Sequence, residues 1–182
     1  MRPRAGLLVA LLVLAAGCGG STPSASEQWA EDVCGPMDDW ATQMQAYSDD
    51  VRAAISSPST DSITTIQTTI EKGAGATNKL ADDLKALGPP PATNGQTVSS
   101  ELDSFAAQIE QTVTEVQNQA KSIQSGATAT EIATAIGAIA SDVSAAIAQG
   151  KSMFESLQET DGELKDAFDT ADSCKQLKND FG

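Results

Sequence analysis

Apolar side chains recur every three or four residues in four long segments of the chain, the spacing that places them on one face of an α-helix. The segments run from about residue 26 to 55, 60 to 87, 97 to 125 and 128 to 160. No run of four or more residues alternates apolar and polar positions, as a half-buried strand would. The pattern therefore predicts an all-α protein built from four long helices.

Helix-ending residues separate these segments. Pro58 follows the first, Gly88 and three consecutive prolines follow the second, and Gly126 follows the third. Glycine and proline at such positions end helices. Thr128, with a glutamate three residues later, has the pattern of a capping box at the start of the fourth segment. Pro36 marks either the start of the first helix or a kink in it. Connections this short predict an antiparallel up-down bundle.

The core of such a bundle must be lean. Hydrophobic residues make up 40% of the 182-residue chain, but aromatic residues make up only 4%, and much of the hydrophobic share is alanine. Few large side chains are therefore available to fill the space between the helices.

Residues 1–17 have the composition of an export signal. Arg2 and Arg4 precede an apolar run over residues 5–16, which at about a dozen residues is shorter than the roughly 20 that a transmembrane helix needs. The segment ends in Leu-Ala-Ala-Gly-Cys, whose cysteine is Cys18. This sequence resembles a bacterial lipobox, in which the signal is cut before a cysteine that carries diacylglycerol.

The resemblance implies a lipoprotein with a lipidated Cys18 as its N-terminus, a flexible tether over residues 18–26 and one helical bundle domain over residues 27–182. Linkers rich in Gly, Ser and Pro suit such a tether, and two or more acyl chains hold a protein stably on a membrane. The implied location is the extracytoplasmic side of the cell membrane. With its paired cysteines and this layout, the chain is similar to small secreted lipoproteins of actinobacteria, many of which lack a known activity.

The two remaining cysteines, Cys34 and Cys174, bear on the topology. If the fourth helix ran unbroken to Cys174, its sulfur would lie roughly 33 Å beyond the level of Cys34, whereas a disulfide needs Cα atoms within about 7 Å. A turn at Asp161-Gly162 brings the two cysteines level. We therefore predict a short fifth helix stapled to the first by a disulfide, which exported proteins favour. The chain has no CxxC spacing and no histidine to support a redox or metal role for this pair.

Charge restricts the choice of partners. Of the 11 basic residues, 9 remain against 25 acidic ones once Arg2 and Arg4 leave with the signal, a net charge of −16. Nucleic acid is excluded as a partner because no basic run exists to displace counterions from phosphates. Adsorption of the domain to anionic lipid is disfavoured by the same sign of charge. The lipid on Cys18 is therefore the predicted means of membrane attachment.

Residue types exclude much of enzyme chemistry. The chain contains no histidine, which removes Ser-His-Asp and Cys-His catalysis, HExxH zinc sites and di-iron bundles. Adjacent acidic residues occur at Asp38-Asp39, Asp49-Asp50 and Asp82-Asp83. Neighbouring residues on a helix face different ways, so we interpret these pairs as a solvated acidic face. We predict no enzyme, no metal and no cofactor, with hydrolysis by two facing carboxylates as the only enzymatic alternative.

Three aromatic side chains of the first segment, Trp29, Trp40 and Tyr47, form either a binding patch or anchors of the core. The leading functional prediction is a non-enzymatic binding or adaptor module of the cell envelope, with an envelope protein as its partner. The alternative is a carrier for a small ligand or cation, with a cavity near Gly73 and Gly150. An enclosed apolar pocket of a few hundred Å³ favours the carrier, and a filled core with one exposed apolar patch favours the adaptor.

Overall fold

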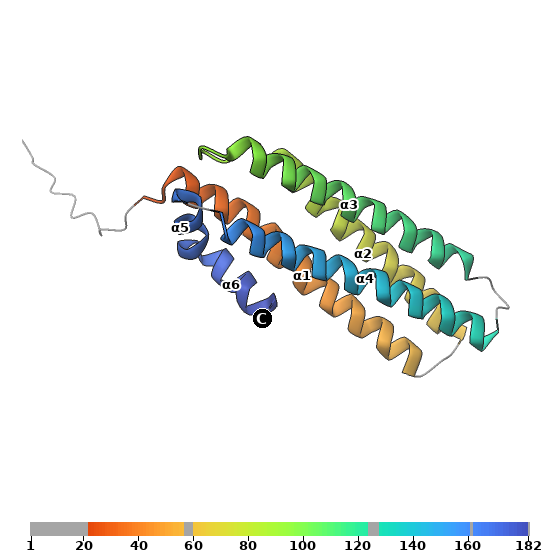
Figure 1. The fold of residues 1–182 in the computed structure, drawn as a ribbon. Coiled ribbons are helices and arrows are strands. Elements are labelled where there is room, and N and C mark those ends of the chain that lie inside the picture. The colour runs from red at the N-terminus through yellow and green to blue at the C-terminus, as the bar shows by residue number, and fades with distance from the viewer. Residues whose placement is uncertain (1–21, 57–59, 124–127, 161, 182) are drawn as a thin grey trace, which may run out of the picture.

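The structure is a computed structural model that describes residues 22–56, 60–123, 128–160 and 162–181. These ranges hold helices and no strand, which confirms the predicted all-α class (Figure 1). The signal, Cys18 and the first part of the tether lie outside the described residues. The helices are α1 (Ala25–Ser56), α2 (Thr60–Ala86), α3 (Gly95–Ser122), α4 (Ala129–Gln158), α5 (Glu163–Thr170) and α6 (Asp172–Phe181).

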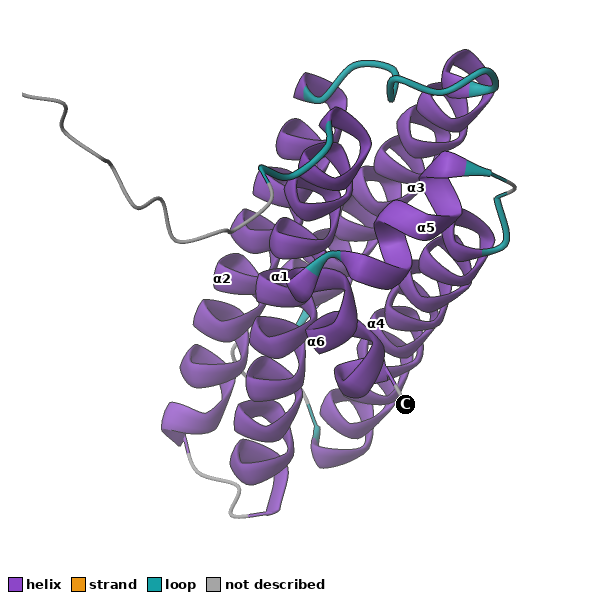
Figure 2. Ribbon diagram, turned by 90° about the vertical axis from the view of Figure 1, so that its left-hand side faces the viewer, coloured by secondary structure: helices purple, strands orange, loops and turns teal. Residues whose placement is uncertain are grey.

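The four long helices lie side by side, and each packs on its neighbour in the chain: α1 on α2, α2 on α3 and α3 on α4 (Figures 1 and 2). The short helices α5 and α6 pack mainly on α1, at the end of the bundle where α1 begins. Between α1 and α4 the direct contact is far smaller than between long helices that follow one another in the chain. We call this line of weak contact the α1–α4 seam.

The predicted apolar stripes are the buried faces of the helices, and they collect in two cores. The disulfide-end core contains the large side chains Trp29, Trp40, Leu102, Phe154, Phe168 and Leu177. The distal core, at the other end of the bundle, consists of Ile66, Ile70, Val116, Ala120, Ile123, Ile136 and Ile139. Aromatic side chains are therefore concentrated at one end, while aliphatic side chains fill the other.

Side-chain caps set where α1 and α4 begin. The backbone N–H of Glu27 donates to Ser24 Oγ at 3.1 Å, while Ser24 N–H donates back to the Glu27 carboxylate at 3.4 Å. This pair starts α1 at Ala25, so two residues assigned above to the tether are helical, and α1 continues through Pro36. The capping box at Thr128 is confirmed at the start of α4.

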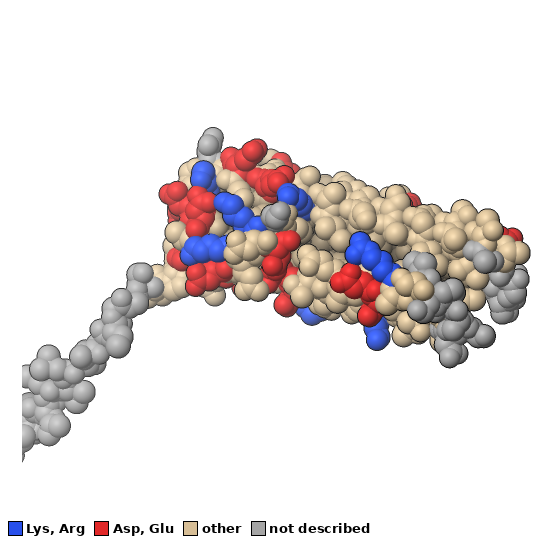
Figure 3. Space-filling model, turned by 90° about the horizontal axis from the view of Figure 1, so that it is seen from below, with Lys and Arg blue, Asp and Glu red and all other residues tan. Residues whose placement is uncertain are grey.

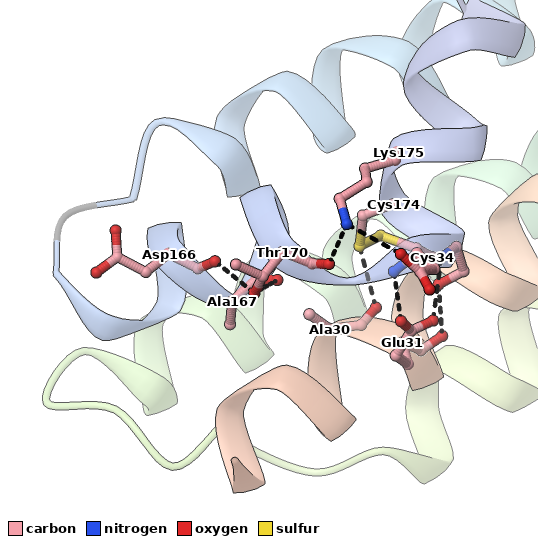
Figure 4. The surroundings of a disulfide bond; sticks show 10 residues. Ala30, Glu31, Cys34, Asp166, Ala167, Thr170, Cys174 and Lys175 are labelled. Carbon is pink, nitrogen blue, oxygen red and sulfur yellow. Dashed lines mark hydrogen bonds and ion pairs between the residues drawn. A yellow bond between two sulfur atoms is a disulfide. The ribbon is translucent and has the colours of Figure 1, made fainter. Parts of the chain in front are cut away.

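The C-terminal segment holds two short helices instead of the single one predicted. After α4 the chain turns through Gly162, whose φ is 84°, and α5 then ends at Thr170, because the next residue, Ala171, leaves the helical conformation with a ψ of 131°. The amides of Asp172 and Ser173 donate to the carboxylate of Glu31 in α1 (Figure 4). This contact from a distant helix caps the start of α6 and favours a second helix.

The predicted disulfide is present and joins α1 to α6 (Figure 4). The Cα atoms of Cys34 and Cys174 lie 4.9 Å apart, and both side chains are fully buried. Burial raises the pKa of Glu31, but hydrogen bonds from Ser173 and Asp172 outweigh it and lower the pKa below its ordinary value. The covalent bond and the Glu31 cap therefore hold the same stretch of α6 against α1.

One described helix, Thr130–Gln158, is long and apolar enough by composition to cross a membrane, with a mean hydropathy of 1.4. Only 17% of the residues in its most apolar stretch are buried. Much of the hydropathy therefore comes from small exposed residues such as Ala133, Ala138 and Ala145. The larger apolar residues of this helix face the two cores.

Replacing both Cys34 and Cys174 by alanine should lower the free energy of unfolding by about 4 to 5 kcal/mol, because the bond closes a very long loop in the unfolded chain. Denaturant titration of the variant and of the wild type will measure the difference. Reduction of the wild-type protein should give a similar loss. A change below about 1 kcal/mol in both experiments would contradict this role of the disulfide.

Candidate functional site

A cavity of about 130 Å³ lies inside the bundle, where all four long helices contribute to its wall. It separates the two cores, because its lining takes residues from each of them. The principal lining residues are Trp40, Met44, Tyr47, Val51 and Arg52 of α1, Thr69, Ile70, Gly73, Ala74 and Thr77 of α2, Ile109, Thr112, Val113 and Val116 of α3, and Ile139, Ala140, Val143, Ser144 and Ala146 of α4.

Small residues at one level of the bundle explain the cavity. Gly73 and Ala74 of α2 line this space together with Ala140 and Ser144 of α4. A Cβ atom added at Gly73 would be 3.6 Å from the nearest atoms of Met44 and Tyr47, which is an ordinary contact distance. Gly73 therefore leaves space instead of bringing the helices into tight contact.

Gly150, in contrast, allows two elements to pack closely. A Cβ atom at this position would lie 3.0 Å from Cζ3 of Trp40, so the glycine lets the indole ring pack closely on α4. Gly150 does not line the cavity. Trp40 packs closely against Gly150 and also lines the cavity, whereas Gly73 leaves space open. The indole of Trp40 therefore forms the wall of the cavity toward the disulfide end.

The polar groups at the inner end of the cavity, next to Trp40, are hydrogen-bonded to one another. The indole Nε1 of Trp40 donates to Thr77 Oγ1 at 3.0 Å, and that hydroxyl donates to the carbonyl of Gly73 at 2.9 Å. Trp40 and Thr77 are 2% and 4% exposed. With these hydrogen bonds formed internally, the inner end offers an apolar surface to any molecule in the cavity.

The outer part of the cavity reaches the surface at the α1–α4 seam. Among the lining residues that the structure describes, the exposed ones are Arg52 of α1 and Ala140 and Ser144 of α4. Within the described part of the chain, Arg52 is also the only charged residue of the lining. It pairs with Asp49 at 3.0 Å, and both side chains are 74% exposed.

Sequence reasoning missed Arg52, although a signal was present: it is the only arginine after the export signal. On the face drawn in Figure 3, charged side chains gather at the disulfide end, and much of the distal half is uncharged. A cationic group at the cavity rim is therefore unusual in its surroundings, because the domain as a whole is strongly acidic.

The three aromatic residues singled out from the sequence do not form one patch. Trp40 and Tyr47 line the cavity, whereas Trp29 lies in the disulfide-end core. Trp29 is 6% exposed, donates from its indole to the carbonyl of Gly88 at 3.1 Å, and packs edge-on against Phe168. Only the first two are placed to contact a ligand.

A pair of carboxyl groups lies apart from the cavity, where α6 packs on α1. Asp38 is 8% exposed, and no donor within the described residues reaches its buried Oδ1. Burial, a hydrogen bond with Asp180 and the negative charges of Asp180 and Asp39 raise the pKa of Asp38 to about 6. The two carboxyl groups share a hydrogen bond. They are therefore closer together than the roughly 5 to 9 Å that separates the two carboxyl groups in glycoside hydrolysis.

Metal binding finds little support in the part of the chain that the structure describes. No group of three or more Cys, Asp or Glu side chains there is arranged to hold a metal ion. Asp49 of the Asp49-Asp50 pair is engaged with Arg52, and Asp83 of the Asp82-Asp83 pair is engaged with Lys79. These pairs are exposed or half-exposed on the helix surfaces.

Comparison with known proteins assigns no family. No protein-family model matches the chain, and neither a curated protein nor a solved structure shows significant similarity to it.

Replacing Asp38 by asparagine should remove a pH dependence of stability. A folded-state pKa raised to about 6 stabilises the fold below the unfolded-state pKa of about 4, and this contribution is lost as the pH rises through 6. At pH 8 the variant should be more stable than the wild type by on the order of 2 kcal/mol. Denaturant titrations at pH 4 and pH 8 will measure this.

The matched control is Asp32→Asn, which removes an exposed carboxylate from the same helix. It should leave the pH dependence of the wild type unchanged. Equal behaviour of the two variants would contradict the assignment to Asp38.

Proposed function

We propose that this protein is a non-enzymatic carrier that binds a small apolar molecule in the cavity between its four long helices. The observation that carries the proposal is the cavity itself. It is largely apolar, takes its lining from both packed cores and has exposed lining residues on α1 and α4. Small-molecule sites of helical proteins are commonly placed between the helices of a bundle.

The size and chemistry of the cavity support an apolar ligand. Its volume of about 130 Å³ is close to that of an engineered apolar cavity of about 150 Å³ that stays dry and binds benzene. Water is a poor occupant, because the inner polar groups of Trp40 and Thr77 already have partners and a bound water needs two to four polar contacts. An apolar molecule gains free energy by covering these walls.

The same cavity favours a carrier over an adaptor. Two of the three aromatic side chains that an adaptor would use for a surface patch, Trp29 and Trp40, are buried. A protein partner would have to bind exposed side chains that are mostly small or charged, whereas interface hot spots are rich in large aromatic residues.

The proposed setting is the cell envelope, with the antiparallel up-down bundle attached to the membrane through a lipid on Cys18. The packing of each long helix on its chain neighbour supports that topology. The lipobox-like sequence supports the anchor. α1 begins at Ala25, which leaves only a short tether, so the disulfide end would face the membrane and the α1–α4 seam would lie farther away.

Binding of an apolar probe tests the carrier. Isothermal titration of the full chain carrying Cys18→Ser with 1-decanol should give saturable binding at one site. Filling the cavity with Ala146→Leu should weaken that binding at least tenfold, because the added side chain occupies the ligand's space. Ala133→Leu makes the same change on an exposed face of α4 and should bind like the parent protein. Binding that is absent, or that the two variants affect equally, would refute the carrier.

Replacing Cys18 by serine in cells tests the anchor. The lipid should be absent from the variant by mass spectrometry, and the protein should move from the membrane fraction to the soluble fraction. Its thermal unfolding should match that of the wild type, because the bundle does not depend on the lipid. Ser21→Ala, a change in the same segment, is the control and should stay in the membrane fraction. A Cys18→Ser variant that remained with the membrane would contradict the proposed anchor.

A further inference from the structure

We propose that the ligand is an amphiphile with one aliphatic chain and a carboxylate head, bound with its chain toward Trp40 and its head at Arg52. The proposal rests on the proposed function, because it names the chemical class that the cavity takes. It is carried by the change of polarity along the cavity, from an apolar inner end to a single cationic group at the rim.

The shape of the cavity favours a chain. Its walls on α2, α3 and α4 each extend over eight or nine residues, from Thr69 to Thr77 on α2 for example, which is roughly 11 to 12 Å at 1.5 Å per residue. A volume of about 130 Å³ spread over that length makes a narrow space. A narrow apolar space lined by Ile, Val and Met suits an extended aliphatic chain better than a compact ring system.

The rim favours an anionic head. Arg52 is the only charged lining residue, and its guanidinium presents paired N–H donors that match the two oxygens of a carboxylate. The half-buried Ser48 adds a hydroxyl group on the α1 side of the seam, whereas the hydroxyl of Ser144 already donates to the carbonyl of Ala140. A head group at the seam would remain in contact with water while the chain is covered.

The present partner of Arg52 is easily exchanged. Its ion pair with Asp49 joins two side chains that are each 74% exposed, and exposed pairs of this kind contribute little to stability. A ligand carboxylate held by the apolar cavity would replace Asp49 at small cost. The pair also keeps the empty rim from carrying an unbalanced charge.

The surrounding charge limits the head to one negative charge. Of the residues that the structure describes, one cationic side chain lines the rim, and Asp49 and Asp50 are adjacent in the chain. A phosphate dianion would leave its second charge unpaired next to these carboxylates, within a domain that is itself strongly acidic. A monoanionic carboxylate matches the single guanidinium.

Titration with decanoate and with 1-decanol separates the head from the chain. The protein is the full chain carrying Cys18→Ser, so that no anchoring lipid competes for the cavity. Decanoate should bind about tenfold more tightly than 1-decanol, as one charge-assisted contact predicts. Arg52→Gln should lower the affinity for decanoate about tenfold and leave that for 1-decanol unchanged. Lys72→Gln, which removes an exposed positive charge outside the lining, should change neither.

A second variant moves the affinity in the opposite direction. Asp49→Asn removes the competitor for Arg52 and should strengthen decanoate binding severalfold, and this gain should disappear when Arg52→Gln is also present. Thermal unfolding of each variant will establish that the exposed substitutions leave the fold intact.

The outcomes distinguish the two proposals. If decanoate and 1-decanol bind equally well and Arg52→Gln changes neither, the head-group assignment is wrong while the carrier stands. If neither probe binds, both proposals fail. A loss of decanoate binding in Lys72→Gln as large as that in Arg52→Gln would show a general charge effect and would also overturn the assignment.

Discussion

The disulfide between Cys34 and Cys174 joins the first helix to the last and spans 140 residues of sequence. Its importance follows from the composition of the protein, because a chain with 4% aromatic residues has few large side chains with which to hold its helices together. Around this bond the chain adds the Glu31 cap on α6, the Asp38–Asp180 contact and a hydrogen bond of 2.6 Å from Lys151 Nζ to the carbonyl of Phe181. The end of α6 is thereby attached to both α1 and α4.

This arrangement divides the bundle into two ends with different packing. The disulfide end contains the aromatic cluster, in which Phe168 contacts both Trp29 and Phe154. The distal end relies on isoleucine and valine, and at the junction between the two cores the helices carry glycine, alanine and serine. Since side chains that small cannot fill the space between helices held apart by larger neighbours on either side, a cavity forms at the junction.

Much of this architecture could be predicted from the sequence, because helical periodicity and helix-ending residues are local signals. The four long helices, the capping box at Thr128 and the turn before α5 follow from them, and level-matching of Cys34 with Cys174 gave the disulfide. The division between α5 and α6 could not be predicted. Ala171 carries no helix-breaking signal, and the cap that favours a new helix comes from Glu31, which lies far away in sequence.

Only part of the candidate site could be predicted from the sequence, for a similar reason. Gly73 on a buried stripe indicated a cavity in the sequence. Whether a glycine creates space or close contact depends, however, on the side chains that face it. Gly73 leaves space, whereas Gly150 allows close contact with Trp40. Trp40 and Tyr47 reach the cavity, while Trp29 packs in the core, although all three lie on one helix. Arg52 was distinguishable as a lone arginine, yet its place at the rim depends on the relative positions of α1 and α4, which periodicity does not fix.

The disulfide and the packing of α5 and α6, which stabilise the bundle, also bear on how a ligand reaches a cavity of this kind. α5 and α6 hold α1 and α4 together only near the disulfide end, and beyond them the two helices make little direct contact along the seam. Separating their distal parts breaks few apolar contacts, so such an opening costs far less than unfolding the domain. The covalent bond limits the movement, because it keeps the aromatic core intact while the seam opens. A lean core held at one end by a disulfide therefore provides both a space and a route to it.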